Sequence, residues 1–403
     1  MNRVVITGLG AISSIGLTVE ETFAALRESF CGIGPLRFRN AERLSVQIGG
    51  QVKHFKPELY FSKQQISLYD KFTQFALIAA QQAISSSGVE ITDHNANNVG
   101  VILGTAGGGI QTQDDNYRQV YEEGKNRVHP LIVPKLMNNA AASHLSIKYN
   151  AQGPCYTVAS ACSSSNHAMG QALNLIRAGS IKIALTGGSE SMLCFGGIKA
   201  WEGLRIMSKD TCRPFCATRD GMVQGEGAAI FVFEEYEHAK KRGAHIFAEV
   251  AGFAMSSDAK DIVNPNSEGA SRAISGALAD AKLNSADIDY INGHGTGTIA
   301  NDRTECKAIK SVFKERAKKI MISSTKSMHG HLIGGTGALE LLSCIMAIKE
   351  GIISPTINYQ EKDPECDLDI VPNFAREKKV NGALSNSFAF GGLNAVLVLK
   401  KLS

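Results

Sequence analysis

The stretch YTVASACSSSNHAMG (156–170) places Cys162 where an apolar run typical of a strand gives way to a run with helical spacing. Free backbone N–H groups at the start of a helix favour a thiolate, so we expect the pKa of Cys162 to be lowered there. A small, buried and unreactive cysteine is equally compatible with this stretch. Whether Cys162 is a nucleophile or a core residue therefore depends on which residues elsewhere in the sequence accompany it.

Two histidines and a lysine occupy glycine-rich segments that follow strand-like runs. His294 lies in NGHGTGT, directly after IDYIN, while Lys326, His329 and His331 lie in STKSMHGHLIGG, after IMISS. Loops at strand ends are where α/β proteins gather catalytic groups. A thiol beside imidazoles is typical of covalent catalysis, so we interpret Cys162 as a nucleophile assisted by these loops.

Other kinds of site have weaker support. A zinc site needs three or four converging ligands, and a His-x-His segment at a turn does not easily direct both rings to one metal. The sequence has no CxxC, and CRPFC (212–216) has no second cysteine pair. GLGAIS (8–13) lacks the third glycine of a dinucleotide fingerprint, and neither GxxxxGK[ST] nor GxSxG occurs. We therefore expect neither a metal nor a bound nucleotide.

Length and charge restrict the class of protein. The 403 residues carry a net charge of only +4, with acids and bases mixed along the chain, so no nucleic-acid-binding block is expected. No apolar run reaches about 18 residues, which predicts no membrane span. The N-terminus is typical of a first strand rather than an export signal. Nine cysteines without such a signal indicate reduced thiols, and we expect a cytoplasmic protein.

Strand-like and helix-like runs alternate along the chain. Strands are expected at 3–10, 99–105, 181–188, 228–235, 246–256, 288–295, 319–325, 382–388 and 395–401, and helices at 71–88, 165–179, 268–283 and 337–351. Because the strands are apolar on both sides, they indicate a buried mixed or parallel sheet with helices on both faces. The order of elements is roughly repeated, so we interpret residues 1–250 and 251–403 as two similar halves.

The segments SACSSSNHA, GHGTGT…ND, STKSMHGHLIGGTGALE and NSFAFGGLN together resemble the β-ketoacyl-acyl carrier protein synthases, the elongating condensing enzymes of fatty acid and polyketide synthesis. The resemblance runs from Val4 to about Lys400. It implies the α/β thiolase fold, in which two βαβαβαββ halves form a five-layer αβαβα body that dimerises through a strand of the first half. The half 1–250 would hold the nucleophile, and the half 251–403 both histidines and a gating loop.

The resemblance also assigns chemical roles. Cys162 accepts the acyl chain as a thioester, and His294 and His331 hydrogen-bond the malonyl thioester carbonyl during decarboxylation. Lys326 orders the histidines and pairs with Glu340. No metal or organic cofactor is implied, because the substrates are carried on the phosphopantetheine of acyl carrier protein.

The remaining implied residues bind substrate or support the site. The backbone amide of Phe390, together with that of the nucleophile, forms an oxyanion hole. Phe388 and Phe390 belong to the gating loop, Thr296 and Thr298 hold the phosphopantetheine arm, and Asp302 is a supporting residue of the site.

Several positions depart from the residues usual in this family. Gly107 stands where a bulky aliphatic residue often lines the acyl pocket, and Ile132 where an aromatic often closes the tunnel across the dimer, which suggests a longer or wider tunnel. Ala389 replaces a glycine and Leu393 a threonine in the gating loop, and Val263 replaces a hydroxyl residue near pantetheine. These changes fit a specialised synthase, for example of aryl-polyene or other polyene assembly, and also a housekeeping fatty acid synthase with altered lining.

Carrier proteins are acidic, so basic residues steer their docking. Lys63, Lys71 and Arg205 occupy docking positions, while other basic positions are lost, which suggests a dedicated carrier protein. We expect a homodimer, or a heterodimer with a chain-length-factor-like subunit. Two alternatives are a non-catalytic chain-length partner, which would not need Cys162, and a cysteine acyltransferase or hydrolase of the same fold.

Overall fold

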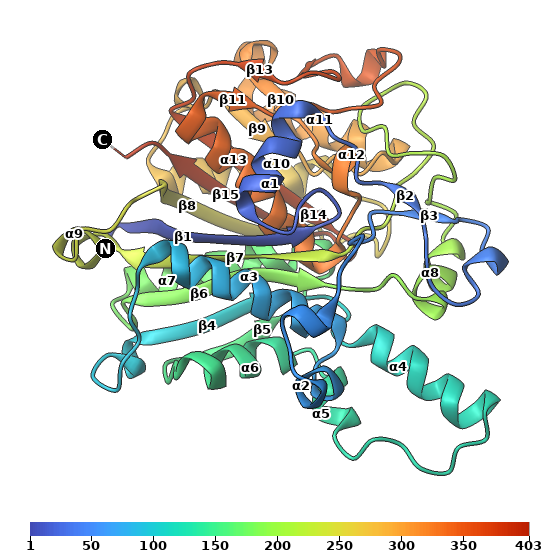
Figure 1. Ribbon diagram of the computed structural model, residues 1–403. Coiled ribbons are helices and arrows are strands. Elements are labelled where there is room, and N and C mark those ends of the chain that lie inside the picture. The colour runs from blue at the N-terminus through green and yellow to red at the C-terminus, as the bar shows by residue number, and fades with distance from the viewer. Residues whose placement is uncertain (403) are drawn as a thin grey trace.

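The computed structural model describes residues 1–402, and its main feature is a sheet of 11 strands in the order β12-β10-β9-β14-β15-β8-β1-β7-β6-β4-β5 (Figure 1). The first half contains β1 (Val4–Ser13), α3 (Lys71–Ser87), β4 (Val99–Gly104), α6 (Ala140–Tyr149), β5 (Cys155–Val158), α7 (Ser164–Arg177), β6 (Ile183–Glu190) and β7 (Gly227–Glu235). The second half contains β8 (Ala248–Ser257), α10 (Ser267–Ala281), β9 (Tyr290–Asn292), α11 (Ile299–Phe313), β10 (Met321–Ser323), α13 (Thr336–Glu350), β14 (Gly382–Ala389) and β15 (Leu393–Lys400).

Both halves follow the same βαβαβαββ order, which confirms the predicted duplication. The first half arranges its strands as β5-β4-β6-β7-β1, and the second repeats this arrangement as β10-β9-β14-β15-β8. The halves join where β1 pairs antiparallel with β8, with Val5 opposite Glu249 and Ile6 opposite Ala248. The division expected between residues 250 and 251 falls inside β8, because this strand begins at Ala248.

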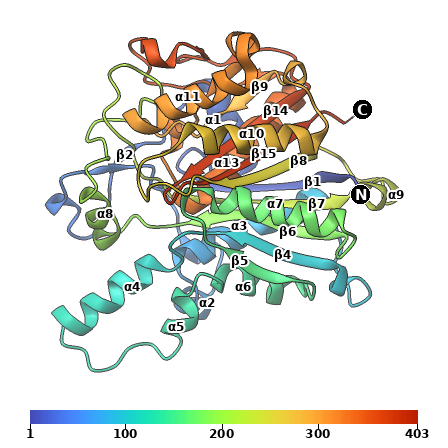
Figure 2. The ribbon, with the colours of Figure 1, turned by 180° about the vertical axis from the view of Figure 1, so that it is seen from behind.

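Successive side chains of a strand point to opposite faces of the sheet, so a separate apolar core lies on each face. In β4, Ile102 points into a central core, whereas Val101 and Leu103 point into an outer core with α3 and α6. In the second half, α10 and α11 cover the outer face with a third core. The layers α3/α6, first-half strands, α7/α13, second-half strands and α10/α11 thus give the predicted five-layer fold (Figures 1 and 2).

The two central helices are α7 and α13. Helix α13 is buried at every residue from Thr336 to Ile348, as expected for a helix that is apolar nearly all round. It also contacts β6 and β7 of the other half, and α7 contacts β8 and β15. Each half therefore supplies one central helix that packs on strands of both halves. Within residues 1–402, no helix is long and apolar enough to cross a membrane.

Candidate active site

Cys162 lies in a sharp turn between β5 and α7. A short 3-10 helix, Ala161–Ser163, leads directly into α7, and Ala161 has a φ of +49°. The hydroxyl of Ser164 fixes this turn, because it accepts a hydrogen bond from the backbone N–H of Ser160 (2.9 Å) and donates one to the carbonyl of Ala161 (2.7 Å). The sulfur is therefore held rigidly at the start of the helix, as the sequence predicted.

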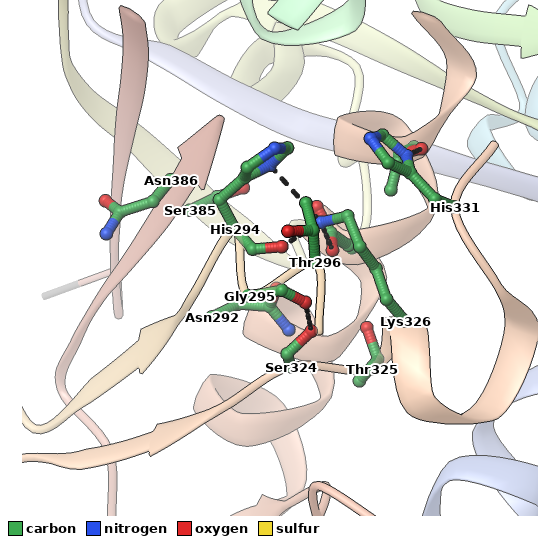
Figure 3. Close-up of polar contacts among 12 residues, drawn as sticks. Asn292, His294, Gly295, Thr296, Ser324, Thr325, Lys326, His331, Ser385 and Asn386 are labelled. Carbon is green, nitrogen blue, oxygen red and sulfur yellow. Dashed lines mark hydrogen bonds and ion pairs between the residues drawn. The ribbon is translucent and has the colours of Figure 1, made fainter. Parts of the chain in front are cut away.

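The structure brings the cysteine and both predicted histidines together. The Sγ of Cys162 and one ring nitrogen each from His294 and His331 lie within 4.8 Å of one another, and all three residues are buried. The imidazole centroids are 5.4 Å apart with the rings nearly perpendicular. Figure 3 shows the two rings entering from separate segments, the loop after β9 and the segment after α12 (Lys326–His329).

His331 is oriented by hydrogen bonds to its Nδ1. The backbone N–H of Ile333 donates to this atom at 3.1 Å, and the hydroxyl of Thr336 lies 2.8 Å from it. A neutral imidazole whose Nδ1 accepts a hydrogen bond must carry its proton on Nε2. That Nε2 is buried and has no partner among residues 1–402, so it offers an unused N–H to the pocket.

His294 has the same proton arrangement for a different reason. The ammonium of Lys326, which can only donate, lies 3.3 Å from Nδ1 of His294 and also donates to the backbone carbonyl of His294. The proton of a neutral His294 is therefore on Nε2 as well. Lys326 is itself paired with Glu340 at 2.5 Å.

Both imidazoles are neutral. Burial lowers the pKa of His294 and of His331 well below the usual value, and the positive charge of Lys326 lowers each further. The site therefore presents two N–H donors without a positive charge on either ring. This arrangement suits stabilisation of a negative charge that develops on one oxygen.

The Cys-His-His cluster is also a possible set of metal ligands. A histidine that binds a metal through Nε2 normally donates its Nδ1–H to an acceptor. Here donors, the ammonium of Lys326 and the N–H of Ile333, face the Nδ1 atoms of His294 and His331. The surrounding groups therefore do not match a metal site, and the absence of a metal stays a prediction.

The pKa expected for Cys162 was wrong in direction. Burial raises the pKa of this thiol to about 12, although Lys326 and the backbone N–H groups of Phe390 and Cys162 act to lower it. A helix start contributes only about 0.3–2 kcal/mol, or at most about 1.5 pKa units, whereas full burial shifts a group by up to about 3–5 units. The resting nucleophile is thus a thiol.

Two buried carboxylates hold the histidine loop. Asp302, predicted as a supporting residue, accepts hydrogen bonds from the backbone N–H groups of Thr296 (3.0 Å) and Gly297 (3.3 Å). Glu305 accepts from the N–H of His294 (2.8 Å) and of Gly295 (2.7 Å). Sequence reasoning missed Glu305, although its position one turn after Asp302 on α11 places both on one face of the helix.

The catalytic groups line a cavity of about 180 Å³. Its walls include the predicted pantetheine residues Thr296 and Thr298, whose hydroxyls are 2.8 Å apart, and both predicted gating-loop phenylalanines. The Phe388 ring lies 6.1 Å from the His294 ring, and the Phe390 ring stacks on Trp201. These residues are therefore gathered at one site as expected.

Gly107 and Ile132 do not line this cavity. A Cβ on Gly107 would come within 2.0 Å of the Met192 Cε and 2.8 Å of the Ile110 Cγ1, so those side chains already fill the space that the glycine leaves. Ile132 is half-buried on α5 (Ile132–Leu136), in the segment that follows α4 (Ile110–Tyr117). Its predicted role across a dimer involves a second chain.

The predicted docking residues differ in exposure. Lys63 begins α2 (Lys63–Leu68) and is exposed, and Arg205 is exposed beside the cavity-lining residue Ile206. Lys71 instead pairs with the buried carboxylate of Glu226 at 2.6 Å, and its side chain is only 18% exposed. We therefore remove Lys71 from the docking residues, because its charge is already compensated.

Comparison with known proteins agrees with this geometry. Residues 1–239 match the family described as beta-ketoacyl synthase, N-terminal domain, and residues 247–360 match its C-terminal domain. Nodulation protein E of Rhizobium sp. (strain N33) is 45% identical over 400 residues, which cover 99% of both chains. The 3-oxoacyl-[acyl-carrier-protein] synthase 2 of Staphylococcus aureus (strain N315) is 40% identical over 406 residues, 99% of this chain and 98% of that one.

Solved structures give the same result. The ishigamide ketosynthase/chain length factor superposes with a TM-score of 0.95 at 35% identity, and a type II polyketide ketosynthase in complex with its acyl-carrier protein with a TM-score of 0.91 at 32% identity. Both comparisons cover the whole of each chain. The protein belongs to the β-ketoacyl synthase family. It is a condensing ketosynthase, an acyltransferase that joins an acyl chain to a malonyl unit carried on acyl carrier protein.

Proposed function

We propose that Cys162 carries the acyl chain. Its sulfur attacks the acyl thioester carbonyl, the bond between that carbonyl and the carrier sulfur breaks, and the thiol proton passes to the departing pantetheine thiol. No net proton is gained or lost, so a thiol with a raised pKa can serve in this exchange. The backbone N–H groups of Cys162 and Phe390, which already face the sulfur, stabilise the oxyanion of the tetrahedral intermediate.

In the second step, His294 and His331 activate the malonyl thioester. Their Nε2–H groups donate to the thioester carbonyl, and loss of CO2 leaves an enolate whose charge is on that oxygen. The enolate carbon attacks the acyl carbonyl on Cys162, a carbon–carbon bond forms, and the cysteine sulfur leaves as a thiolate that takes up one proton from solvent. Thr296 and Thr298 hold the pantetheine arm, while Phe388 separates the two half-reactions.

The observation that carries this proposal is the convergence of the Cys162 sulfur and one ring nitrogen each from His294 and His331 within 4.8 Å of one another. Replacement of Cys162 by Gln tests it. We expect condensation to be lost while decarboxylation of malonyl-acyl carrier protein is retained. A cysteine hydrolase would lose all activity, and a non-catalytic partner subunit would lose none. As a matched variant, His331→Ala should still acquire an acyl group on Cys162, measured by intact mass, but should no longer decarboxylate.

For the pathway, we propose a specialised synthase of the polyene or polyketide type rather than a housekeeping fatty acid synthase. This is supported by the likeness to a ketosynthase/chain length factor and to nodulation protein E. The partner is then a dedicated acyl carrier protein that docks near Lys63 and Arg205, and the second subunit is a chain-length-factor-like protein or another copy of this chain. Intact and native mass of the protein purified from its host would identify the acyl group and the second subunit.

The compartment that fits this proposal is the cytoplasm. All nine cysteines are free, and seven of them, including Cys162, are buried. A thiol nucleophile needs surroundings in which thiols stay reduced. Fractionation of the host cell, with the protein detected by antibody, would contradict this if the protein were recovered outside the cytoplasmic fraction.

A further inference from the structure

Glu190 is a fully buried carboxylate that the proposed chemistry does not use. It is the last residue of β6, and it has no ion-pair partner among residues 1–402. Its oxygens accept four hydrogen bonds, from the hydroxyl of Thr105 (2.9 Å) and from the backbone N–H groups of Ala106 (2.7 Å), Gly107 (3.2 Å) and Gly334 (3.1 Å). A carboxylate held only by such donors is costly to bury, so its position calls for an explanation.

The hydrogen bond between Gly334 and Glu190 is linked to His331 through the neighbouring residue Ile333. Gly334 follows Ile333, whose φ is +48°, a conformation that a β-branched residue rarely adopts. The N–H of this same Ile333 donates to Nδ1 of His331 and so places the His331 proton on Nε2. The strained backbone is therefore what orients the donor group.

Gly334 is clamped from two sides. Glu190 holds its N–H, and the hydroxyl of Ser165 on α7 donates to its carbonyl. A Cβ at Gly334 would come within 2.7 Å of the Glu190 Oε2 and 2.3 Å of the Ala106 backbone nitrogen. Only a glycine can lie this close to both Glu190 and Ala106. Gly334 therefore connects the loop after β4 in the first half to the histidine segment of the second half.

We propose that Glu190 is a positioning residue for decarboxylation, because its carboxylate holds Gly334 and thereby keeps the Ile333 N–H on Nδ1 of His331. Glu190 touches neither substrate nor the reacting atoms. The inference rests on the proposed role of His331. It predicts that loss of Glu190 affects the turnover of malonyl substrate more than its binding.

The experiment uses the full-length protein with Cys162→Gln as background, so that decarboxylation of malonyl-acyl carrier protein is measured without acylation. Addition of Glu190→Gln should lower kcat about 10- to 100-fold, as expected when a catalytic group is misplaced. KM should change by less than about threefold, since substrate binding is not altered. Glu234→Gln is the matched control, because Glu234 is equally buried but opposes Ile183 at the other end of the β6–β7 pair. This control should leave kcat within about threefold.

A rescue variant separates positioning from general stability. Glycine adopts a positive φ freely, so Ile333→Gly added to Glu190→Gln should recover part of the lost kcat. If Glu190→Gln does not fold, Gly334→Ala breaks the same contact from the other side and should give the same loss of kcat.

Unchanged decarboxylation in Glu190→Gln or in Gly334→Ala would overturn the inference, as would a loss that Ile333→Gly does not reduce. If Cys162→Gln alone fails to decarboxylate, the proposed function itself fails, and the role of Glu190 falls with it.

Discussion

The Nζ of Lys326 lies 2.5 Å from Oε1 of Glu340, and neither side chain is exposed to solvent. The same ammonium donates to the carbonyl of His294 and faces its Nδ1. One ion pair thus sets both the backbone position and the proton position of a catalytic histidine. Because the pair is buried, removing one partner leaves the other without compensation.

We expect Lys326→Met to lower the free energy of unfolding by about 3–5 kcal/mol, the cost of breaking a buried ion pair. Decarboxylation should also fall, because Nδ1 of His294 loses its donor and the ring can then carry its proton on the wrong nitrogen. Denaturant unfolding at a fixed protein concentration measures the first effect. In the double variant Lys326→Met/Glu340→Gln, the loss of stability should be smaller than the sum of the two single losses. Strict additivity would show that the pair is not coupled.

Glu305 gives a second prediction, on the histidine loop. Glu305→Ala leaves the N–H groups of His294 and Gly295 without an acceptor, and each buried orphan costs about 1–3 kcal/mol. Thermal unfolding should therefore shift to lower temperature, and malonyl decarboxylation should decrease. The control is Glu237→Ala on the surface helix α9 (Tyr236–Lys241), which should alter neither quantity. Wild-type stability in Glu305→Ala would show that the loop holds its shape without this carboxylate.

The buried His329 predicts a dependence of stability on pH. Burial lowers the pKa of His329 to about 3, while the unfolded chain takes up a proton near pH 6.5. Between these values the unfolded state binds more protons, so the contribution of His329 to stability falls as the pH falls, by about 1.4 kcal/mol per pH unit. We expect the difference in unfolding free energy between wild type and His329→Asn to change with this slope from pH 6 to about pH 4. A difference that does not vary with pH would mean that His329 is already protonated in the folded state.

Much of the fold could be predicted because its strands are apolar on both sides. All nine expected strands correspond to strands of the sheet, and the four expected helices correspond to α3, α7, α10 and α13. Helices α6 and α11 are not distinct in the sequence pattern. The run AAASHLSIKY of α6 shows little difference in apolar character between its faces. Helix α11 begins directly after the glycine loop, and charged residues interrupt its apolar stripe.

The site could be predicted only where side chains themselves do the chemistry. Cys162, His294 and His331 stand out because their residue types and glycine-rich surroundings point to catalysis. Glu190 accepts hydrogen bonds from backbone N–H groups that are far away in the sequence, and such a pairing has no signature along the chain. Glu305 accepts from the nearby N–H groups of His294 and Gly295, and its only signal is its position one helical turn after Asp302. The pKa of Cys162 was misjudged for a related reason, since the sequence shows the start of a helix but not how completely the sulfur is buried.

The last prediction concerns the length of the acyl chain. Met192 packs in the same apolar cluster as Cys162, and its terminal methyl occupies the space beside Gly107. Methionine is flexible, so this plug can move, but a larger residue at position 107 would compete for the same space. We therefore expect Met192→Ala to admit longer acyl chains onto Cys162 and Gly107→Ile to restrict the enzyme to shorter ones. Competition among acyl carrier proteins of different chain length, with the product on Cys162 read by intact mass, measures both shifts. Met255→Ala serves as the control and should leave the length preference unchanged, because Met255 lies on β8 with its side chain exposed to solvent. If both variants keep the wild-type length preference, the tail of the acyl chain passes elsewhere and Gly107 does not set the tunnel.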